Sequence, residues 1–223
     1  MVSEVDKQLF KACEEGDAKK AQELIDKGAD INVRDGDGRT ALMRASKRGH
    51  IEVVKLLLEK GADVRARDKN NRTCVMGASK KGHVDILKLL VDAGADINSH
   101  DNSLRTALMR AAFNGEIKAV EFLVEHGVDM DAKDDKGRTA MMEAVLAFKV
   151  DCIHYLLQKG ADPNAQDNEG CTCLMRAAYG GYEDLCIFLL DRGADKDIKD
   201  NHGYRAIDYV RNQLSEDLEK RLK

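Results

Sequence analysis

An eight-residue segment of the chain, RTALMRAS at residues 39–46, returns at a fixed step of 33 residues. Related segments begin at Arg72, Arg105, Arg138 and Cys171, and a degraded one begins at Tyr204. A second marker, Gly-Ala-Asp or Gly-Val-Asp, keeps the same step and begins at Gly28, Gly61, Gly94, Gly127, Gly160 and Gly193. A period of this length is typical of stacked arrays, in which no unit buries its apolar face alone. The repeat therefore predicts one elongated body whose units contact only their neighbours.

The composition favours helices over sheets. Among the 223 residues there is no Trp and a single Pro, which suits helices rich in Leu and Ala, so we predict an all-α fold. The net charge of −4 gives no general attraction to nucleic acid or to an anionic membrane. The charge is uneven, with 14 Lys/Arg against 9 Asp/Glu in residues 34–99 and 3 against 7 in residues 166–198. The sequence thus predicts a basic region followed by an acidic one.

The sequence predicts neither a membrane segment nor a secretory signal. No apolar run approaches the ~20 residues that a membrane-spanning helix needs, and the first residues are too acidic for a signal peptide. We therefore expect a cytoplasmic, intracellular location, with a nuclear or host-delivered protein left open. The six cysteines fall mainly where other repeats have small or apolar residues, which favours reduced core thiols over disulfides. Cys171 and Cys173 have no second ligand pair at metal spacing, so neither a metal nor a cofactor is expected.

Residues 34–66 illustrate one repeat. Thr40 suits the N-cap of a first helix because its hydroxyl can accept from the free amides of the first turn. Gly49 ends this helix where a left-handed residue is wanted, and a second helix with apolar residues at helical spacing runs to Gly61. The next stretch is rich in Asp, Asn and Gly and predicts a projecting turn. Each unit is therefore expected to be a helix–turn–helix with a β-turn or hairpin finger.

This pattern resembles the ankyrin repeat, whose Asp-x-x-Gly-x-Thr-Pro-Leu-His-x-Ala-Ala core and Gly-Ala-Asp ending match over essentially the whole chain. The resemblance implies an all-α ankyrin-repeat solenoid of stacked helix–turn–helix units with projecting fingers. Two positions depart from the family pattern throughout. The family's Pro is replaced by Ala41, Cys74, Ala107, Ala140 and Cys173, and its His by Met43, Met76, Met109, Met142 and Met175. The Thr–His hydrogen bond typical of the family is therefore expected to be absent, with a pliable thioether packing in its place.

The first and last units differ from the others at positions that should face a neighbouring unit. Lys20 and Glu23 stand where later units carry mostly apolar residues, and Asp208 of the last unit stands at the Met position. Terminal units of stacked arrays need such polar outer faces. We therefore predict a single ankyrin-repeat domain over residues 1–223. It comprises an N-terminal cap at 1–33, internal repeats at 34–66, 67–99, 100–132, 133–165 and 166–198, and a C-terminal cap at 199–223.

The sequence contains no catalytic constellation. There is no Gly-x-Ser-x-Gly, no His-Glu-x-x-His and no Gly-Lys-Ser/Thr loop. Gly36-x-Gly38-x-x-Ala41 imitates a dinucleotide-binding fingerprint, but no strand is expected before it and the repeat accounts for it. We therefore predict that the protein is not an enzyme.

The resemblance implies that a ligand meets the concave side of the array, which finger tips and first helices form. The residue after the finger glycine position is Arg39, Arg72, Arg105 and Arg138 in four successive repeats, and we call these the finger arginines. The ends of the first helices carry Lys47, Arg48, Lys80 and Lys81 in two repeats and then Phe113, Leu146 and Tyr179 in the next three. Arg44, Arg110 and Arg176 recur on the first helices and are expected to add to this predicted partner-binding surface.

The basic residues of this surface have a simpler explanation, whereas the apolar residues do not. Lysines and arginines at helix ends can merely complement the helix dipole and keep the protein in solution. Apolar residues clustered on positions that are normally polar and exposed favour an interaction patch instead. Aromatic residues and arginine are also the types that dominate binding hot spots.

Two irregularities lie close to Phe113 and Leu146. Leu104 replaces the finger glycine, where a positive φ is awkward for Leu, so this finger should be either reshaped or strained. Phe148 replaces the glycine that follows the first helix in other repeats, so the turn there should differ. Together they favour a specialised centre in residues 102–148.

The sequence therefore favours a non-catalytic scaffold that binds another protein, with an acidic segment of the partner on residues 34–99 and an apolar anchor on the later repeats. A monomer is expected. The alternative is a sensor of an anionic or oligonucleotide ligand that uses the finger arginines, with stacking from Phe113 or Tyr179. The net charge and the acidic repeat 166–198 disfavour long nucleic acid, which needs a continuous basic track. A regulatory arm separated from an enzyme is a third alternative, which the two caps disfavour.

Overall fold

The computed structural model describes residues 3–211 and 215–223, which are helical, with no strand and one isolated bridge between His100 and Thr106. The all-α prediction is confirmed. The helices are α1 (Glu4–Glu15), α2 (Ala18–Asp26), α3 (Ala41–Arg48), α4 (Ile51–Glu59), α5 (Cys74–Ser79), α6 (Val84–Asp92), α7 (Ala107–Asn114), α8 (Ile117–Glu125), α9 (Ala140–Leu146), α10 (Val150–Gln158), α11 (Cys173–Gly180), α12 (Glu183–Asp191), the 3₁₀ turn η1 (Ala206–Tyr209) and α13 (Glu216–Leu222).

The chain forms two compact units. The first comprises residues 1–111 and 118–128, and the second comprises residues 112–117 and 129–223. A single domain that runs continuously over residues 1–223 stays a prediction.

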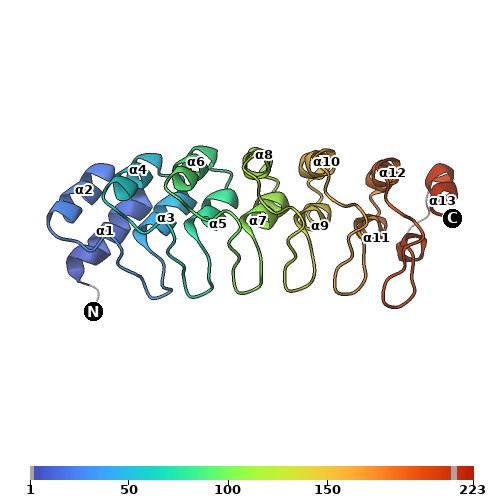
Figure 1. Ribbon diagram of the computed structural model, residues 1–223, viewed down its shortest axis with the longest axis horizontal. Coiled ribbons are helices and arrows are strands. Elements are labelled where there is room, and N and C mark those ends of the chain that lie inside the picture. The colour runs from blue at the N-terminus through green and yellow to red at the C-terminus, as the bar shows by residue number, and fades with distance from the viewer. Residues whose placement is uncertain (1–2, 212–214) are drawn as a thin grey trace. The chain divides into compact units, whose positions relative to one another are not determined.

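The first unit contains three complete helix pairs, α1 with α2, α3 with α4 and α5 with α6, together with most of α7 and most of α8 (Figure 1). The two helices of each pair pack against each other. Between pairs, α1 packs on α3 and α3 on α5, while α2 packs on α4 and α4 on α6. Fully buried leucines such as Leu42, Leu57 and Leu87 fill the space between them. This is the packing between neighbours that the repeat predicts.

The second unit repeats this arrangement with α9 and α10, α11 and α12, and the closing segments η1 and α13. α9 packs on α11, α11 on η1, and α12 on α13. The first helix of the last repeat is reduced to a 3₁₀ turn. Asp208 is exposed in this turn, at the position where the five internal repeats bury a methionine. At the other end of the chain, Lys20 and Glu23 are also exposed and pair with each other at 3.3 Å.

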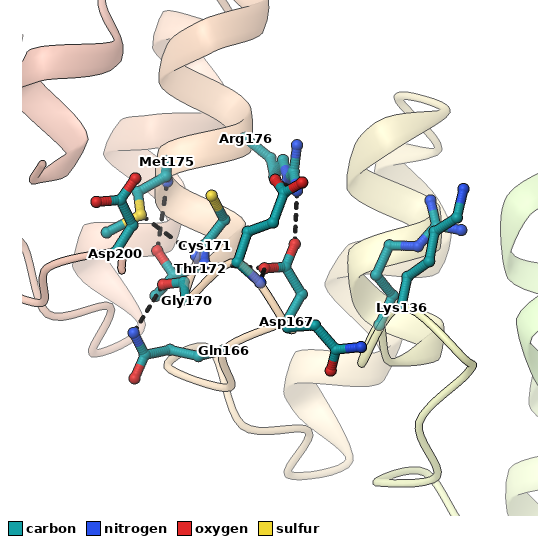
Figure 2. Close-up of polar contacts among 12 residues, drawn as sticks. Lys136, Gln166, Asp167, Gly170, Cys171, Thr172, Met175, Arg176 and Asp200 are labelled. Carbon is teal, nitrogen blue, oxygen red and sulfur yellow. Dashed lines mark hydrogen bonds and ion pairs between the residues drawn. The ribbon is translucent and has the colours of Figure 1, made fainter. Parts of the chain in front are cut away.

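The first helices of the five internal repeats begin at threonines. The hydroxyls of Thr40, Thr73, Thr106, Thr139 and Thr172 each accept from the amide of the Met three residues later, at 3.3–3.4 Å. The N-cap predicted for Thr40 is therefore confirmed. In α11 the sulfur of Met175 in turn accepts from the amide of Thr172 at 3.4 Å (Figure 2). The thioether thus completes a reciprocal cap at the position where the resemblance implies a histidine.

The methionine position lies in the core, as the sequence predicts. Met76, Met109, Met142 and Met175 are at most 1 % exposed, and Met43 is 7 % exposed. All five side chains therefore pack between helices instead of facing solvent.

The six cysteines are all buried free thiols. Burial raises the pKa of Cys13, Cys74, Cys173 and Cys186 to about 12. A thiol with so high a pKa is almost never a thiolate at neutral pH, so these residues are inert. They pack in the core, as their positions in the repeat predict.

Two large side chains hold the left-handed backbone conformation that other repeats assign to glycine. Leu104 has φ 58° and Phe148 has φ 52°, whereas the glycines at the equivalent positions have φ between 69° and 87°. The amide of Leu104 still donates to the carbonyl of Asp101 at 2.9 Å, and that of Phe148 to the carbonyl of Val145 at 3.1 Å. The finger at Leu104 is therefore strained and not reshaped. The prediction that the turn at Phe148 differs was wrong, because Phe148 adopts the conformation of the glycine it replaces.

We expect Leu104→Gly and Phe148→Gly each to raise the free energy of unfolding by up to about 1 kcal/mol. Glycine removes ~1–2 kcal/mol of left-handed strain but loses roughly 0.5–1 kcal/mol more conformational entropy on folding. Asn71→Gly is the matched control, since Asn71 has φ 61° and Asn tolerates this conformation. Urea unfolding measures all three variants. A Phe148→Gly protein that is less stable than the wild type would show that the side-chain contacts of Phe148 outweigh its strain.

Candidate functional site

Each finger is built around an aspartate that is buried or half-buried. One carboxylate oxygen of Asp167 accepts from the amides of Glu169 and Cys171, both at 2.9 Å. The other oxygen pairs with Arg176 at 2.5 Å (Figure 2). The same backbone donors, two and four residues later, serve Asp35, Asp68, Asp101, Asp134 and Asp200. The aspartate therefore fixes the shape of its finger by satisfying the amides of the turn.

In four repeats a side chain nine residues later donates to the second oxygen of the aspartate. Arg44 pairs with Asp35 at 2.5 Å, Arg110 with Asp101, and Arg176 with Asp167 at 2.5 Å, while the Tyr209 hydroxyl donates to Asp200 at 2.6 Å. Burial by itself raises the pKa of Asp35, but hydrogen bonds from Arg44 and from two finger amides bring it below its ordinary value. Arg44 and Arg110, which the sequence assigns to the partner-binding surface, are thus tied to their own fingers.

The repeat 67–99 has Gly77 at that position, so its finger arginine takes over. Arg72 donates through Nε to the carboxylate of Asp68 at 2.8 Å, and the Asp68 side chain is only 3 % exposed. Burial by itself raises the pKa of Asp68, but the amides of Arg72 and Asn70 and the Arg72 side chain bring it below its ordinary value.

The repeat 133–165 has Glu143 at that position, and here the finger arginine bridges two acids. Arg138 lies 3.0 Å from Asp134 and 3.1 Å from Glu143, whose side chains are 0 % and 1 % exposed. The Arg138 side chain itself is 19 % exposed. This arginine therefore compensates two buried charges.

The finger arginines are engaged within the protein. Arg39 reaches Asp37 at 2.8 Å and Asp68 at 3.5 Å, and Arg105 also has internal partners. Their guanidinium groups are less available to a ligand than the sequence alone suggests.

The helix-end lysines are more available than the arginines. Lys47, Lys80 and Lys81 are exposed, and none of them forms an ion pair among residues 3–211 and 215–223. Arg48, in contrast, pairs with Glu14 of the first repeat at 2.7 Å. The lysines therefore remain as charges that a ligand could neutralise.

A hollow of about 90 Å³ lies in the first unit between α3 and α5. Its border is formed by Arg39, Met43, Lys47, Asp68, Arg72, Thr73, Met76, Gly77, Lys80 and Arg110. The structure thus brings together five of the residues that the sequence assigns to the partner-binding surface.

In the second unit the ends of the first helices expose large apolar side chains. Phe113 is 43 % exposed, Leu146 39 % and Tyr179 49 %. α9 packs on α11, and a methyl group on Gly115, after Phe113, would lie 2.8 Å from the side chain of Lys149. The three residues therefore lie on consecutive repeats that touch one another.

Three more exposed apolar residues were not assigned to the surface from sequence. They are Leu104, Phe148 and Tyr204, of which Phe148 packs on the ring of Tyr182 with centroids 4.2 Å apart. The available signal was an apolar or aromatic residue at a position that other repeats fill with glycine or arginine. Gly77 was also missed, and its signal was the reverse, a glycine where the other internal repeats carry long charged side chains.

The described residues hold neither a cluster of metal ligands nor a membrane-spanning helix. Residues 3–211 and 215–223 contain no group of three or more His, Cys, Asp or Glu side chains placed to hold a metal ion. Among the same residues, no helix has both the length and the apolar character needed to cross a membrane.

Comparisons with known proteins agree with this architecture. The sequence matches the family described as ankyrin repeats (3 copies) over residues 9–101 and again over residues 108–200. The fold is similar to that of the human ASB11 ankyrin repeat domain in its crystal structure, with a TM-score of 0.87 and 25 % sequence identity, over 96 % of this chain and 95 % of that one. No curated protein matches the sequence. Because the two family matches together span most of the repeats, the chain belongs to the ankyrin-repeat family.

Proposed function

We propose that the protein is a non-catalytic scaffold that binds another protein through its fingers and the ends of its first helices. Ankyrin repeats are general protein–protein interaction modules. The observation that carries the proposal is the placement of the exposed apolar residues. In residues 3–211 and 215–223 all six large ones lie on fingers, on first-helix ends or in the turn that follows, and none lies on a second helix.

The free energy lost by leaving these apolar side chains exposed to water supports an interaction role for them. Full burial of one large apolar side chain is worth ~1.5–3 kcal/mol, so several exposed on one kind of element favour burial by a partner. Leu104 and Phe148 are in addition strained where glycine would not be. Retaining both strain and exposure at the same positions is typical of functional surfaces, where stability is lower than the fold allows.

The proposed partner offers two kinds of contact. An apolar anchor packs on Phe113, Leu146 and Tyr179 of the second unit, and an acidic segment meets Lys47 and Lys80 of the first unit. Tyr179 is prepared for such a contact, since the Arg211 guanidinium lies 3.7 Å from its ring centre and stiffens it by cation–π attraction. A monomeric state and a cytoplasmic location belong to the same proposal.

The alternative of an oligonucleotide sensor has less support. It depends on the finger arginines, and Arg72 and Arg138 are paired with Asp68 and Asp134. A chain of phosphates needs several free cations in a row.

Phe113→Ala is expected to weaken partner binding by roughly 1 kcal/mol or more, as for a hot-spot anchor, with folding intact. The partner can be captured by a photo-reactive side chain placed at Leu146 and its affinity then measured by calorimetry. Leu146→Ala and Tyr179→Ala should weaken the same complex.

Phe188→Ala makes the same change on a second helix, α12, and serves as the matched control once its folding is verified. A captured partner that binds the Phe113, Leu146 and Tyr179 variants as tightly as the wild type, or binds the Phe188 variant least, would contradict the proposed surface. The absence of any saturable partner would contradict the function itself.

A further inference from the structure

The hollow in the first unit exists because one repeat has a glycine where the others have a long side chain. At this position the repeats carry Arg44, Gly77, Arg110, Glu143 and Arg176. Gly77 lies inside α5, where glycine is roughly 1 kcal/mol less favourable than alanine. A methyl group on Gly77 would lie 3.3 Å from Cβ of Lys47. An arginine there would extend towards Asp68, as its counterparts extend towards their own aspartates, and would occupy the hollow.

Positive charges outnumber negative ones around this hollow. Its border holds five cationic side chains, Arg39, Lys47, Arg72, Lys80 and Arg110, and one carboxylate, Asp68. Two more carboxylates pair with these cations from outside the border, Asp37 with Arg39 at 2.8 Å and Asp101 with Arg110. Five positive against three negative charges leave two positive charges uncompensated.

The two uncompensated charges belong to Lys47 and Lys80. Partial burial of the otherwise exposed Lys47 side chain lowers the pKa of its ammonium, and repulsion from Lys80 and then from neighbouring arginines lowers it further. Like charges held together by a fold gain from a counter-ion more than isolated charges do. An anion in the hollow would therefore stabilise the charged state of both lysines.

We propose that this hollow binds the phosphate monoester of a phosphorylated side chain on the partner protein, an inference that rests on the proposed scaffold function and gives its acidic segment a specific chemistry. A phosphate monoester carries roughly −1.5 to −2 charges at neutral pH and three acceptor oxygens, which match the two lysines. A carboxylate carries a single charge and would leave one lysine uncompensated.

The size of the hollow fits one such group. A cavity needs a volume of roughly 10–15 Å³ to hold one water molecule. The hollow, with a volume of about 90 Å³, therefore has room for several oxygen atoms. Sites for drug-sized ligands measure ~300–1,000 Å³, so the hollow by itself encloses far less than a nucleotide. Arg72 gives only its Nε–H to Asp68, so the N–H groups of its terminal nitrogens are left for a phosphate oxygen.

Methionines at the border provide a local readout of binding. Met43 and Met76 line the hollow, whereas Met109, Met142 and Met175 do not. The full-length protein, with ¹³C-labelled methionine methyl groups, is titrated at constant ionic strength with N-acetyl-O-phosphoserine methylamide. We expect saturable NMR shifts at Met43 and Met76, and binding of the corresponding glutamate derivative that is weaker by about tenfold or more, because charge-assisted bonds to the second lysine are lost.

Three variants distinguish binding in the hollow from a general attraction by positively charged side chains. Lys47→Gln with Lys80→Gln should weaken phosphoserine binding about tenfold or more. Lys55→Gln with Lys88→Gln removes the same charge from second helices α4 and α6 and should leave affinity within about twofold, since exposed distant charges are screened. Gly77→Arg adds a positive charge but fills the hollow, so it should abolish the shifts. Its fold is expected to hold, because Arg44, Arg110 and Arg176 occupy the same position.

Several outcomes would overturn the proposal. Stronger binding to Gly77→Arg, or equal loss in the Lys55/Lys88 control, would show that general charge attracts the ligand. Equal affinity for the glutamate derivative would replace the phosphate by a carboxylate. Inorganic phosphate that binds more tightly than phosphoserine within an acidic peptide would point to a free ion, and a single-stranded oligonucleotide that binds tightest, with a steep salt slope, to nucleic acid. The scaffold function would survive the first two results, because its own test uses apolar residues of the second unit.

Discussion

Arg138→Met is expected to lower the free energy of unfolding by about 3 kcal/mol or more. The Arg138 guanidinium lies 3.0 Å from Asp134 and 3.1 Å from Glu143, and both carboxylates are almost fully buried. The substitution keeps an apolar stem but removes this counter-charge from two groups that water reaches poorly. A buried charge that loses its partner is among the most destabilising single changes. Urea unfolding at neutral pH measures the loss.

Two comparison variants show whether buried charge is the cause. Arg39→Met makes the same change at the same position of another repeat, but Arg39 pairs with exposed Asp37 and only distantly, at 3.5 Å, with Asp68. Its cost should stay below about 1 kcal/mol. Adding Asp134→Asn and Glu143→Met to Arg138→Met removes the unpaired charges and should recover most of the stability. Equal losses for Arg39→Met and Arg138→Met, or no recovery in the triple variant, would contradict this explanation.

The same geometry changes how binding to the finger arginines should be tested. A variant that removes all four finger arginines would also remove the partners of three buried acids, Asp68, Asp134 and Glu143, so a lost interaction could reflect lost folding. Lys47 and Lys80 are better targets, because neither forms an ion pair in the described part of the chain and both are exposed.

Met109→Ala is the second large effect, with an expected loss of about 2–5 kcal/mol in the free energy of unfolding. Met109, in α7, is 0 % exposed, so its side chain lies in the core. Alanine leaves a cavity in this core, which costs the transfer free energy of the removed atoms and the dispersion contacts of the cavity walls. Urea unfolding with an unchanged slope would confirm a pure loss of stability.

Met43→Ala provides the graded comparison for this core position. Met43 is 7 % exposed and borders the hollow, so water can enter the space that its side chain leaves. Its loss should fall below that of Met109→Ala, since the cavity is open on one side. A larger loss at Met43 would show that the hollow is packed more tightly than its border suggests.

Local rules explain why much of the fold could be predicted from the sequence. Thr40 and Gly49 begin and end α3 as expected, because capping depends on a few neighbouring backbone groups. The exposed Lys20 and the buried Met109 were identified by comparing equivalent positions of the repeats. This works because equivalent positions have similar surroundings, so the residue types found there show whether the position is buried. The turn at Phe148 was mispredicted, because Phe148 keeps the left-handed conformation of the glycine that it replaces, which a large side chain by itself disfavours.

The candidate site was predicted less completely. The exposure of Phe113, Leu146 and Tyr179 follows from their position at the ends of first helices. The pairing of the finger arginines could not be predicted in this way. It depends on which residue stands nine positions after each finger aspartate and on whether that residue can reach the aspartate. Gly77 cannot, so Arg72 turns to Asp68, and the vacated space becomes the hollow.

The sequence by itself determined the repeat, the helix pairs, the capped ends of individual helices and the residues that face the core, because these depend on a period and on local chemistry that recurs in every unit. Only the tertiary structure decided which charged side chains form ion pairs inside the fold and which remain available to a ligand. Ion pairs form between side chains brought together by packing across repeats. A single difference, Gly77 at the position that holds Arg44 and Arg110 in neighbouring repeats, redirects these pairs without altering the repeat pattern of the chain.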